Sequence, residues 1–495
     1  MITPEHLARQ AAARPGAIAV IDRGREVSYH AFDRDVRKFV RAIRALGLKP
    51  GAIVAIGCED VYVHFLLLLA CERLAVATAS ILAIEHADTA ILAHADLVLV
   101  ETHFTMARSK PQFAITPQWI ASVLAGPADE AADAPILSPD DPVRVLRTSG
   151  TTGMQKLVLL KQRTHELRIN EYIAFSHIDE RARFLVTMPF SVGGIYHHAK
   201  ACIHAGGAVI IANMNDRLDA VRAIANHAVT HVILMPLQIK QVLDDLPLDF
   251  PKPPNLTITS FGGSIGPALR TRAYERLATA LLDFYGSNES GFIARMCEAP
   301  DGEPVPIWPG VEVEIVDEQD VLQPEGRAGR LRVRSPFMVE DYWHDPEATR
   351  AMFKNGWFYP GDVAALFPGR RLRLVGRGDE MLNIGGGKRP PAFFEDMIAA
   401  QLKAADIGVC TIRSRAGVDE LCIALVQPEL RGEELLNRVM YILRSHGVGF
   451  FHVMLLNKIP RNALGKIERA RLRQEIDDLR SRSAARPGPG SPQRN

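Results

Sequence analysis

Leu146-Arg-Thr-Ser-Gly-Thr-Thr-Gly-Met-Gln-Lys156 is the most informative stretch of this chain. Gly150 and Gly153 let the backbone turn tightly and approach a ligand closely. The free N–H groups of such a loop can converge on an anion, and Lys156 adds a positive charge. Because Gln155 precedes the lysine, the stretch is not a Walker A loop. It favours phosphate binding, and the alternative is a Ser/Thr/Gly surface turn.

Composition limits the broad class of protein. The 495 residues exceed one compact core and predict about three domains, or one large domain and a smaller one. A hydrophobic content of 47% and a charged content of 23% are typical of a soluble globular enzyme. The net charge of +1 gives no reason to expect nucleic acid or an anionic membrane as a partner. Six scattered cysteines without a Cys-x-x-Cys pair predict reduced thiols in a cytoplasmic protein. The most apolar helix candidate, residues 63–76, is too short to span a bilayer, and we expect a monomer or homodimer.

The middle of the chain alternates short apolar runs with helical periodicity. Residues 184–188, 208–212 and 231–235 have the character of buried strands, and residues 218–228 and 237–246 have helical spacing. Strand and helix in this rhythm predict α/β layers with a parallel sheet.

The character of the sequence changes near residue 304. Val311–Val316 and Gly329–Arg334 alternate with a period of two and predict a small antiparallel β unit. The predicted fold class is therefore α/β: a large N-terminal domain of layered α/β subdomains plus this β unit, followed by a small mobile α+β C-terminal domain. The boundaries that we predict are 1–375 for the N-terminal domain, 376–480 for the C-terminal domain and 481–495 for a disordered tail rich in Ser, Pro, Gly and Arg.

Five further motifs follow the opening loop in a fixed order. They are Phe261-Gly-Gly-Ser264, Phe284-Tyr-Gly-Ser-Asn-Glu-Ser290, Trp357-Phe-Tyr-Pro-Gly-Asp362, Gly376-Arg-Gly-Asp379 and Pro460-Arg-Asn-Ala-Leu-Gly-Lys-Ile467. Each motif alone is weak, but six in order over about 320 residues form a strong signal. From Pro4 to Leu479 the chain resembles the adenylate-forming superfamily, which includes acyl- and aryl-CoA ligases, adenylation domains of peptide synthetases and luciferase.

The resemblance implies an ATP-dependent carboxylic acid ligase. Such an enzyme forms an acyl-AMP with release of pyrophosphate and passes the acyl group to a pantetheine thiol. The implied cofactors are ATP, Mg²⁺ and coenzyme A, or the phosphopantetheine of an acyl carrier protein. Contacts with the β- and γ-phosphates are implied for Thr148, Ser149, Gly150, Thr151, Thr152, Gly153 and Lys156. Contacts with the rest of the nucleotide are implied for Gly262, Gly263, Ser264, Tyr285, Gly286, Ser287, Asn288, Asp362 and Arg377.

Lys466, Glu289 and Thr152 are the predicted catalytic residues. Glu289 is implied to hold Mg²⁺, and the alternative is an acid in the first turn of a helix. Lys466 is implied to bridge the acid and the α-phosphate, and the alternative is a solvated lysine. For Asp362 and Arg377 the alternative is a surface ion pair. Asp379 matches the hinge of the family, and the resemblance places Gly385, Gly386 and Gly387 beside the pantetheine arm.

Apolar residues near these motifs predict an acid pocket for a medium-length aliphatic or an aryl acid. The alternative is ordinary core packing. The predicted lining residues are Phe190, Ile195, Met235, Ile265 and Phe292.

The chain departs from the family pattern at Gln155 and Leu157, at Asn288, and at Pro360, where proline, glycine, threonine and threonine are usual. Two rival functions stay open, and the departures favour only the second. One is an adenylation enzyme that loads a carrier protein, and the other is a nucleotide-binding protein without ligase activity.

Overall fold

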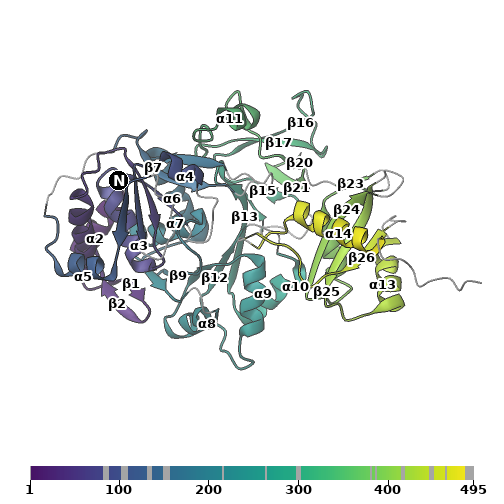
Figure 1. Ribbon diagram of the computed structural model, residues 1–495, viewed down its shortest axis with the longest axis horizontal. Coiled ribbons are helices and arrows are strands. Elements are labelled where there is room, and N and C mark those ends of the chain that lie inside the picture. The colour runs from purple at the N-terminus through teal and green to yellow at the C-terminus, as the bar shows by residue number, and fades with distance from the viewer. Residues whose placement is uncertain are drawn as a thin grey trace, which may run out of the picture. The chain divides into compact units, whose positions relative to one another are not determined.

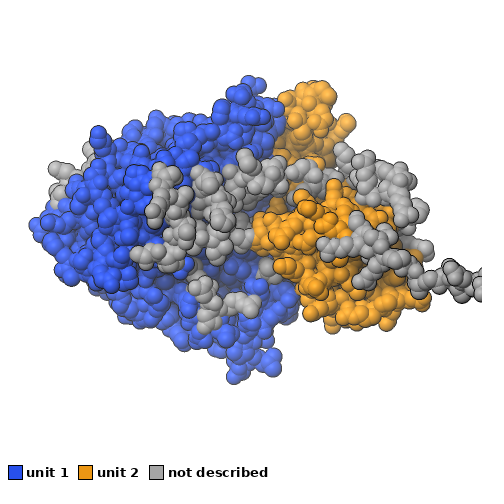
Figure 2. All heavy atoms as spheres, in the orientation of Figure 1, with its two compact units in different colours: residues 1–313, 332–360 blue, residues 314–331, 361–495 orange. Residues whose placement is uncertain are grey.

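The chain divides into two compact units, coloured blue and orange in Figure 2. Unit 1 comprises residues 1–313 and 332–360, and unit 2 comprises residues 314–331 and 361–495. The computed structural model describes residues 2–81, 89–101, 110–130, 137–148, 156–213, 217–261, 265–296, 303–378, 382–384, 387–413, 419–444, 451–462 and 465–484.

An eight-stranded sheet forms one layer of unit 1 (Figure 1). Six neighbouring strands are parallel, and the two edge strands are antiparallel to their neighbours. In spatial order the strands are β14 (Gly291–Arg295), β13 (Ala280–Ser287), β12 (Thr257–Ser260), β11 (His231–Ile233), β9 (Arg183–Val186), β10 (Ala208–Ile211), β1 (Ile18–Asp22) and β2 (Arg25–Ser28). The chain order reverses beside β11, and ligands of open α/β sheets bind at such reversals, beyond the carboxyl ends of the strands.

A six-stranded sheet forms a second layer of the same unit. Its strands are parallel except for the edge strand β8, which pairs antiparallel with β7. In spatial order they are β6 (Gln112–Ile115), β5 (Leu97–Glu101), β3 (Ile53–Gly57), β4 (Ala77–Ser80), β7 (Pro142–Arg147) and β8 (Leu157–Lys161). The opening loop of the sequence thus connects the two strands at one edge of this sheet.

Helices fill the space between the sheets and cover the outer faces (Figure 1). The inner helices are α1 (Thr3–Ala13), α3 (Val61–Arg73), α6 (Gln162–Ser176) and α7 (Gly193–Ala205). They are joined by an ion pair in the core, because Lys200 Nζ of α7 lies 2.7 Å from Glu72 Oε2 of α3. The remaining helices of unit 1 are α2 (Tyr29–Arg44), α4 (Thr89–His94), α5 (Pro117–Ala125), α8 (Arg217–Asn226), α9 (Pro236–Asp245), α10 (Pro267–Arg276) and α11 (Pro346–Met352).

A buried carboxyl on β13 makes the stability of unit 1 dependent on pH. Burial raises the pKa of Asp283 to about 7, although the Arg270 guanidinium acts in the opposite direction. Because its pKa is raised in the folded state, the protonated carboxyl contributes to the stability of the fold. This contribution is fully present below the unfolded pKa of roughly 4 and is lost as the pH rises through the folded pKa. Between about pH 5 and pH 7 we expect a loss of about 2 to 3 kcal/mol from this group.

The variant Asp283→Asn cannot ionise, so it should lose less stability across that interval. At each pH we compare the free energy of unfolding of the variant with that of the wild type. The variant minus wild-type difference should be about 2 to 3 kcal/mol larger at pH 7 than at pH 5. Denaturant unfolding at the two pH values measures this difference. Parallel pH profiles for the two proteins would show that Asp283 is ionised in the fold.

Unit 2 contains two antiparallel strand pairs and a small three-stranded sheet. Strand β20 (Asp362–Phe367) pairs antiparallel with β21 (Arg371–Arg377), and β22 (Leu382–Ile384) pairs with β23 (Gly387–Arg389). A three-stranded sheet follows, with α12 and α13 packed on one face and α14 on the other. Its elements are α12 (Pro391–Ala399), β24 (Asp406–Arg413), β25 (Asp419–Val426), α13 (Gly432–Arg444), β26 (Phe451–Leu455) and α14 (Arg469–Ala484).

Two strands cross the boundary between the units, β16 (Glu312–Val316) and β17 (Gly329–Arg334). In unit 1, Val333 of β17 pairs with Phe358, and in unit 2, Gly329 of the same strand pairs with Ala364. The short strands of unit 1 in this part of the chain are β15 (Val305–Pro306), β18 (Phe353–Lys354) and β19 (Trp357–Phe358).

The predicted fold class is confirmed: a large α/β N-terminal part is followed by a smaller α+β part. The exact domain boundaries at residues 375 and 480 stay predictions, although the two compact units divide at residues 360 and 361. Helix α14 extends to Ala484, four residues into the predicted tail, and residues 485–495 lie outside the described part. Among the described residues, no helix is both long and apolar enough to cross a bilayer.

Candidate active site

The opening loop is closed at its base by a main-chain hydrogen bond. The N–H of Thr148 donates to the carbonyl of Lys156 over 2.8 Å, directly beyond the paired ends of β7 and β8. Residues 149–155, which include the predicted Ser149, Gly150, Thr151, Thr152 and Gly153, lie outside the described residues. Thr148 and Lys156, the two described ends of the loop, therefore lie together beyond the carboxyl end of β7.

The turn after β13 carries Glu289 and lies against this loop base. The Asn288 side-chain amide donates to the Arg147 carbonyl over 2.7 Å, and thus joins the ends of the two sheets. Gly286 permits the turn, since a Cβ there would lie 2.3 Å from the carbonyl oxygen of Gly291. Of the predicted adenosine residues, Tyr285, Gly286 and Ser287 belong to β13. Glu289 itself is 6% exposed and is therefore not a solvated acid.

Tyr342 connects Glu289 to Lys156. Its hydroxyl donates to Glu289 Oε1 over 2.8 Å, and the Lys156 ammonium lies 4.8 Å from the centre of its ring. The structure thus brings together the predicted phosphate lysine and the predicted metal carboxylate through one aromatic residue. Tyr342 follows Glu289 by 53 positions and belongs to none of the six motifs. No local sequence pattern therefore indicates this role.

Arg168 of α6 is a second residue that the sequence did not identify. Its Nε donates to the Phe337 carbonyl over 2.9 Å, and its Nη2 lies 3.0 Å from the carbonyl of Asn288 and 3.3 Å from that of Glu289. Burial lowers the pKa of Arg168 to about 10, against the opposing effects of Tyr172 and Glu289, so the guanidinium remains charged. The turn that carries the predicted metal ligand is therefore held by a buried cation.

In unit 2, Asp362 and Arg377 face each other across β20 and β21. Arg377 Nη1 lies 3.3 Å from Asp362 Oδ1, and Asp362 is 8% exposed. The ion pair that we considered as the alternative is present, and its aspartate is largely buried. Nucleotide binding by these two residues stays a prediction.

Lys466 lies at the end of a tightly held turn of unit 2. Asn462 accepts the Lys466 N–H at its side-chain oxygen over 3.0 Å and donates its own N–H to the Lys466 carbonyl over 2.9 Å. Arg461, paired with Asp406 at 2.7 Å, also donates to the Gly465 carbonyl. The bonds from Asn462 and Arg461 to residues 465 and 466 all use the main chain of those two residues, and none of the described hydrogen bonds uses the Lys466 ammonium.

Comparison with known proteins decides the family. Residues 7–343 match the family of AMP-binding enzymes. This chain belongs to that family. An indoleacetate–CoA ligase of Aromatoleum aromaticum is 26% identical over 95% of this chain and 98% of its own length. The fatty acid–[acyl-carrier-protein] ligase MmaC of Mycobacterium marinum is 25% identical over 77% of this chain and 79% of its own length.

The fold agrees with this assignment. The crystal structure of ATP-bound MatB from Rhodopseudomonas palustris matches with a TM-score of 0.82 at 20% identity, over 97% of this chain and 100% of that one. The predicted enzyme class is thereby confirmed: the protein is an AMP-forming ligase that joins a carboxylic acid to a thiol.

The predicted acid-pocket residues of this AMP-binding enzyme are all buried, but the described ring contacts do not gather them. Phe190 stacks on Phe65 at 5.2 Å, whereas Phe292 contacts Phe284 at 4.3 Å in a different aromatic group. Ile265 belongs to the apolar core beside the eight-stranded sheet. Ile195 and Met235 are 0% and 6% exposed. Core packing therefore accounts for at least Ile265, and the composition of the pocket stays a prediction.

Several predicted residues lie outside the described part of the chain. They are Gly262, Gly263 and Ser264 after β12, the hinge residue Asp379, and Gly385 and Gly386 of the predicted pantetheine site. Gly387 begins β23 and pairs with Ile384.

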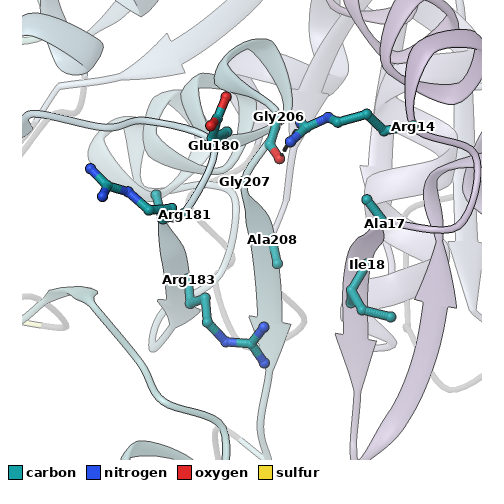
Figure 3. Close-up of a pocket in the computed structure, with 10 residues that line it drawn as sticks. Arg14, Ala17, Ile18, Glu180, Arg181, Arg183, Gly206, Gly207 and Ala208 are labelled. Carbon is teal, nitrogen blue, oxygen red and sulfur yellow. Dashed lines mark hydrogen bonds between the residues drawn. The ribbon is translucent and has the colours of Figure 1, made fainter.

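A pocket of about 180 Å³ opens elsewhere on unit 1 (Figure 3). Its arginines already have partners: Arg14 binds the Gly206 carbonyl at 2.7 Å, Arg181 pairs with Asp179 at 2.7 Å, and Arg183 Nε donates to the His227 carbonyl. Glu180 also lines it. The pocket contains none of the predicted catalytic or nucleotide-binding residues.

The residues around Glu289 fit a magnesium ion that arrives with ATP. Among the described residues, no group of three or more His, Cys, Asp or Glu side chains is placed to hold a metal ion. Mg²⁺ commonly binds one or two carboxylates together with substrate phosphates. The Glu289 carboxyl is buried and accepts a hydrogen bond from the Tyr342 hydroxyl at one of its two oxygens. One protein carboxylate near the base of the predicted phosphate loop is the donor set expected for such a site.

Proposed function

We propose that this AMP-binding enzyme activates a medium-length aliphatic or an aryl acid with MgATP and transfers the acyl group to coenzyme A. One observation supports this most strongly. Asn288 and Tyr342 tie the Glu289 turn to the base of the phosphate loop, at Arg147 and Lys156, so that a carboxylate and a lysine flank one site. Charge neutralisation of this kind suits a reaction that brings two anions together.

The first step is a displacement at the α-phosphorus of ATP. An oxygen of the substrate carboxylate forms the new bond to phosphorus, the bond to the β-phosphate oxygen breaks, and pyrophosphate leaves. In the proposal Thr148, Lys156 and the loop between them bind the β- and γ-phosphates, while Lys466 neutralises the charge that develops between the acid and the α-phosphate. When bound at Glu289, Mg²⁺ supplies Lewis-acid polarisation of phosphate oxygens.

The second step transfers the acyl group. The thiol of coenzyme A loses its proton and its sulfur attacks the acyl carbonyl, and AMP leaves with the electrons of the broken carbon–oxygen bond. Tyr285 is proposed to stack on adenine, and Asp362 to accept hydrogen bonds from the ribose hydroxyls. Because positioning supplies most of the catalysis, no covalent enzyme intermediate is required.

The acceptor thiol is decided by product analysis. We expect that the enzyme, ATP, Mg²⁺ and a panel of acids yield AMP and an acyl-CoA that mass spectrometry detects. The competing acceptor is a phosphopantetheinylated carrier protein, since MmaC is named as an acyl-carrier-protein ligase. AMP formation with acylation of the carrier and none of coenzyme A would overturn the choice of acceptor while leaving the ligase class intact.

A further inference from the structure

The Arg168 guanidinium binds main-chain carbonyls in two segments that meet at the predicted metal site. It is buried, and its three described hydrogen bonds go to the carbonyls of Phe337, Asn288 and Glu289. Among the described residues, no carboxylate oxygen is hydrogen-bonded to it. Burying a cation without a hydrogen-bonded carboxylate costs free energy, so the presence of an arginine at this position calls for an explanation.

Arg168 connects the Glu289 turn to residues 335–342. The same two segments meet directly, because the Val339 N–H donates to the Glu289 carbonyl over 2.8 Å. A Cβ at Gly291 would lie 2.8 Å from the Phe337 Cβ, which shows how closely the segments pack. The guanidinium reaches both segments at once, and a planar group with five donors in a fixed geometry is suited to this task.

We propose that Arg168 is a positioning residue that sets the metal affinity of the site by fixing the Glu289 turn. The proposal rests on the proposed function of Glu289 as the magnesium ligand. Tyr342 holds one carboxylate oxygen and Arg168 holds the main chain that carries the side chain, so the direction of the carboxylate is fixed from both ends. Loss of partners that orient a metal ligand typically costs about 10- to 100-fold in metal affinity or activity.

The charge of Arg168 and its geometry act in opposite directions on a bound cation. The Arg168 guanidinium lies 3.3 Å from the Glu289 carbonyl oxygen, so its positive charge is close to any cation that Glu289 binds and repels it. Removing the positive charge alone would therefore strengthen the binding of a cation to Glu289, whereas loosening the turn weakens it. Arg168→Lys separates the two effects, since it keeps the charge but a single ammonium cannot reproduce the planar fork across both segments.

The test compares the binding of ATP with Mg²⁺ and with EDTA, measured by calorimetry on the intact protein. In the wild type, Mg²⁺ should strengthen ATP binding. In Arg168→Lys we expect the affinity for MgATP to fall about 10- to 100-fold while the affinity for metal-free ATP changes less than about 3-fold. The Mg²⁺ concentration that half-saturates ATP–pyrophosphate exchange should rise by a similar factor, with the KM of the acid unchanged.

A matched control lies on the same helix. Arg163 is half exposed, and its described side-chain partners are Glu340 and Asp140 rather than the carbonyls that Arg168 binds. Arg163→Lys should leave the ratio of the two ATP affinities at the wild-type value. If Arg168→Lys weakens binding of MgATP and metal-free ATP by the same factor, or weakens neither, the positioning role is refuted. If Mg²⁺ does not strengthen ATP binding to the wild type, the assignment of Glu289 under the proposed function fails instead.

A more disruptive variant completes the series. Arg168→Met removes both charge and hydrogen bonds, and we expect it to melt at a lower temperature than Arg168→Lys. Should Arg168→Met fail to fold, the comparison of Arg168→Lys with Arg163→Lys still decides the proposal, because both variants retain the positive charge.

Discussion

Lys466→Ala should reduce acid-dependent ATP–pyrophosphate exchange about 100- to 1,000-fold, which is the usual cost of removing one group that stabilises developing charge. It should leave thioester formation from supplied acyl-AMP within about 3-fold of the wild type, because the α-phosphate displacement is then already complete. The two rates are measured separately, the first by isotope exchange and the second by release of AMP with coenzyme A.

The structure explains why this substitution should remove the ammonium without disturbing the turn. The turn is held by the main chain of residues 465 and 466 through Asn462 and Arg461, so alanine at position 466 removes only the amine and its stem. Lys458, exposed in the preceding segment, provides the control, and Lys458→Ala should leave both rates unchanged. Equal losses in the two half-reactions of Lys466→Ala would contradict the role assigned to the ammonium.

Glu289→Gln should reduce exchange by a comparable factor, about 100- to 1,000-fold, through a different cause. The amide oxygen of glutamine can still accept the Tyr342 hydroxyl, and Arg168 and Val339 still bind the main-chain carbonyl. The fold and the hydrogen bonds are therefore preserved while the negative charge is lost. We expect Mg²⁺ to strengthen ATP binding much less in this variant than in Lys466→Ala.

The control for Glu289→Gln lies in the adjoining segment. Glu340 is 56% exposed and pairs with Lys161 at 2.6 Å on the surface, so Glu340→Gln should have little effect on exchange. A Glu289→Gln enzyme with wild-type exchange and a wild-type requirement for Mg²⁺ would remove Glu289 from the metal site. Such a result would leave the family assignment untouched.

Much of the fold follows from local pattern. Short apolar runs and helical spacing place β9, β10, β11, α8 and α9 within a few residues of their observed bounds, because each of these elements buries one face or is short and apolar throughout. The sequence analysis did not identify α7. Most of its residues are buried, so it has no polar face, and Gly193-Gly194 and His197-His198 interrupt any simple periodicity.

The motifs predicted residues of the site but not the residues that support them. Glu289, Lys156 and Asn288 were identified from short local sequences, and the structure joins them through Tyr342 and Arg147. Tyr342 and Arg168 act on residues 53 and 121 positions away in the chain, so their roles depend on tertiary contacts that no local pattern contains. A charged residue such as Arg168 is expected at the surface, and only the partners of its guanidinium explain its burial.

The departures from the family pattern have structural consequences at two positions. The Asn288 side-chain amide donates to the Arg147 carbonyl. The Asn288 side-chain oxygen lies close to Gly193, because a Cβ added at Gly193 would be 2.8 Å from it. Leu157 is buried at the start of β8, where it pairs with Arg147. Both residues therefore contact Arg147 at the base of the predicted phosphate loop.

Acid-dependent exchange of labelled pyrophosphate into ATP tests the central claim most directly, because it reports reversible formation of an acyl adenylate without any thiol acceptor. With a panel of short and medium aliphatic, aryl and arylalkyl acids, we predict exchange that requires both Mg²⁺ and one class of acid, and that is lost in Lys466→Ala. No exchange above the acid-free background with any acid of the panel would contradict the account.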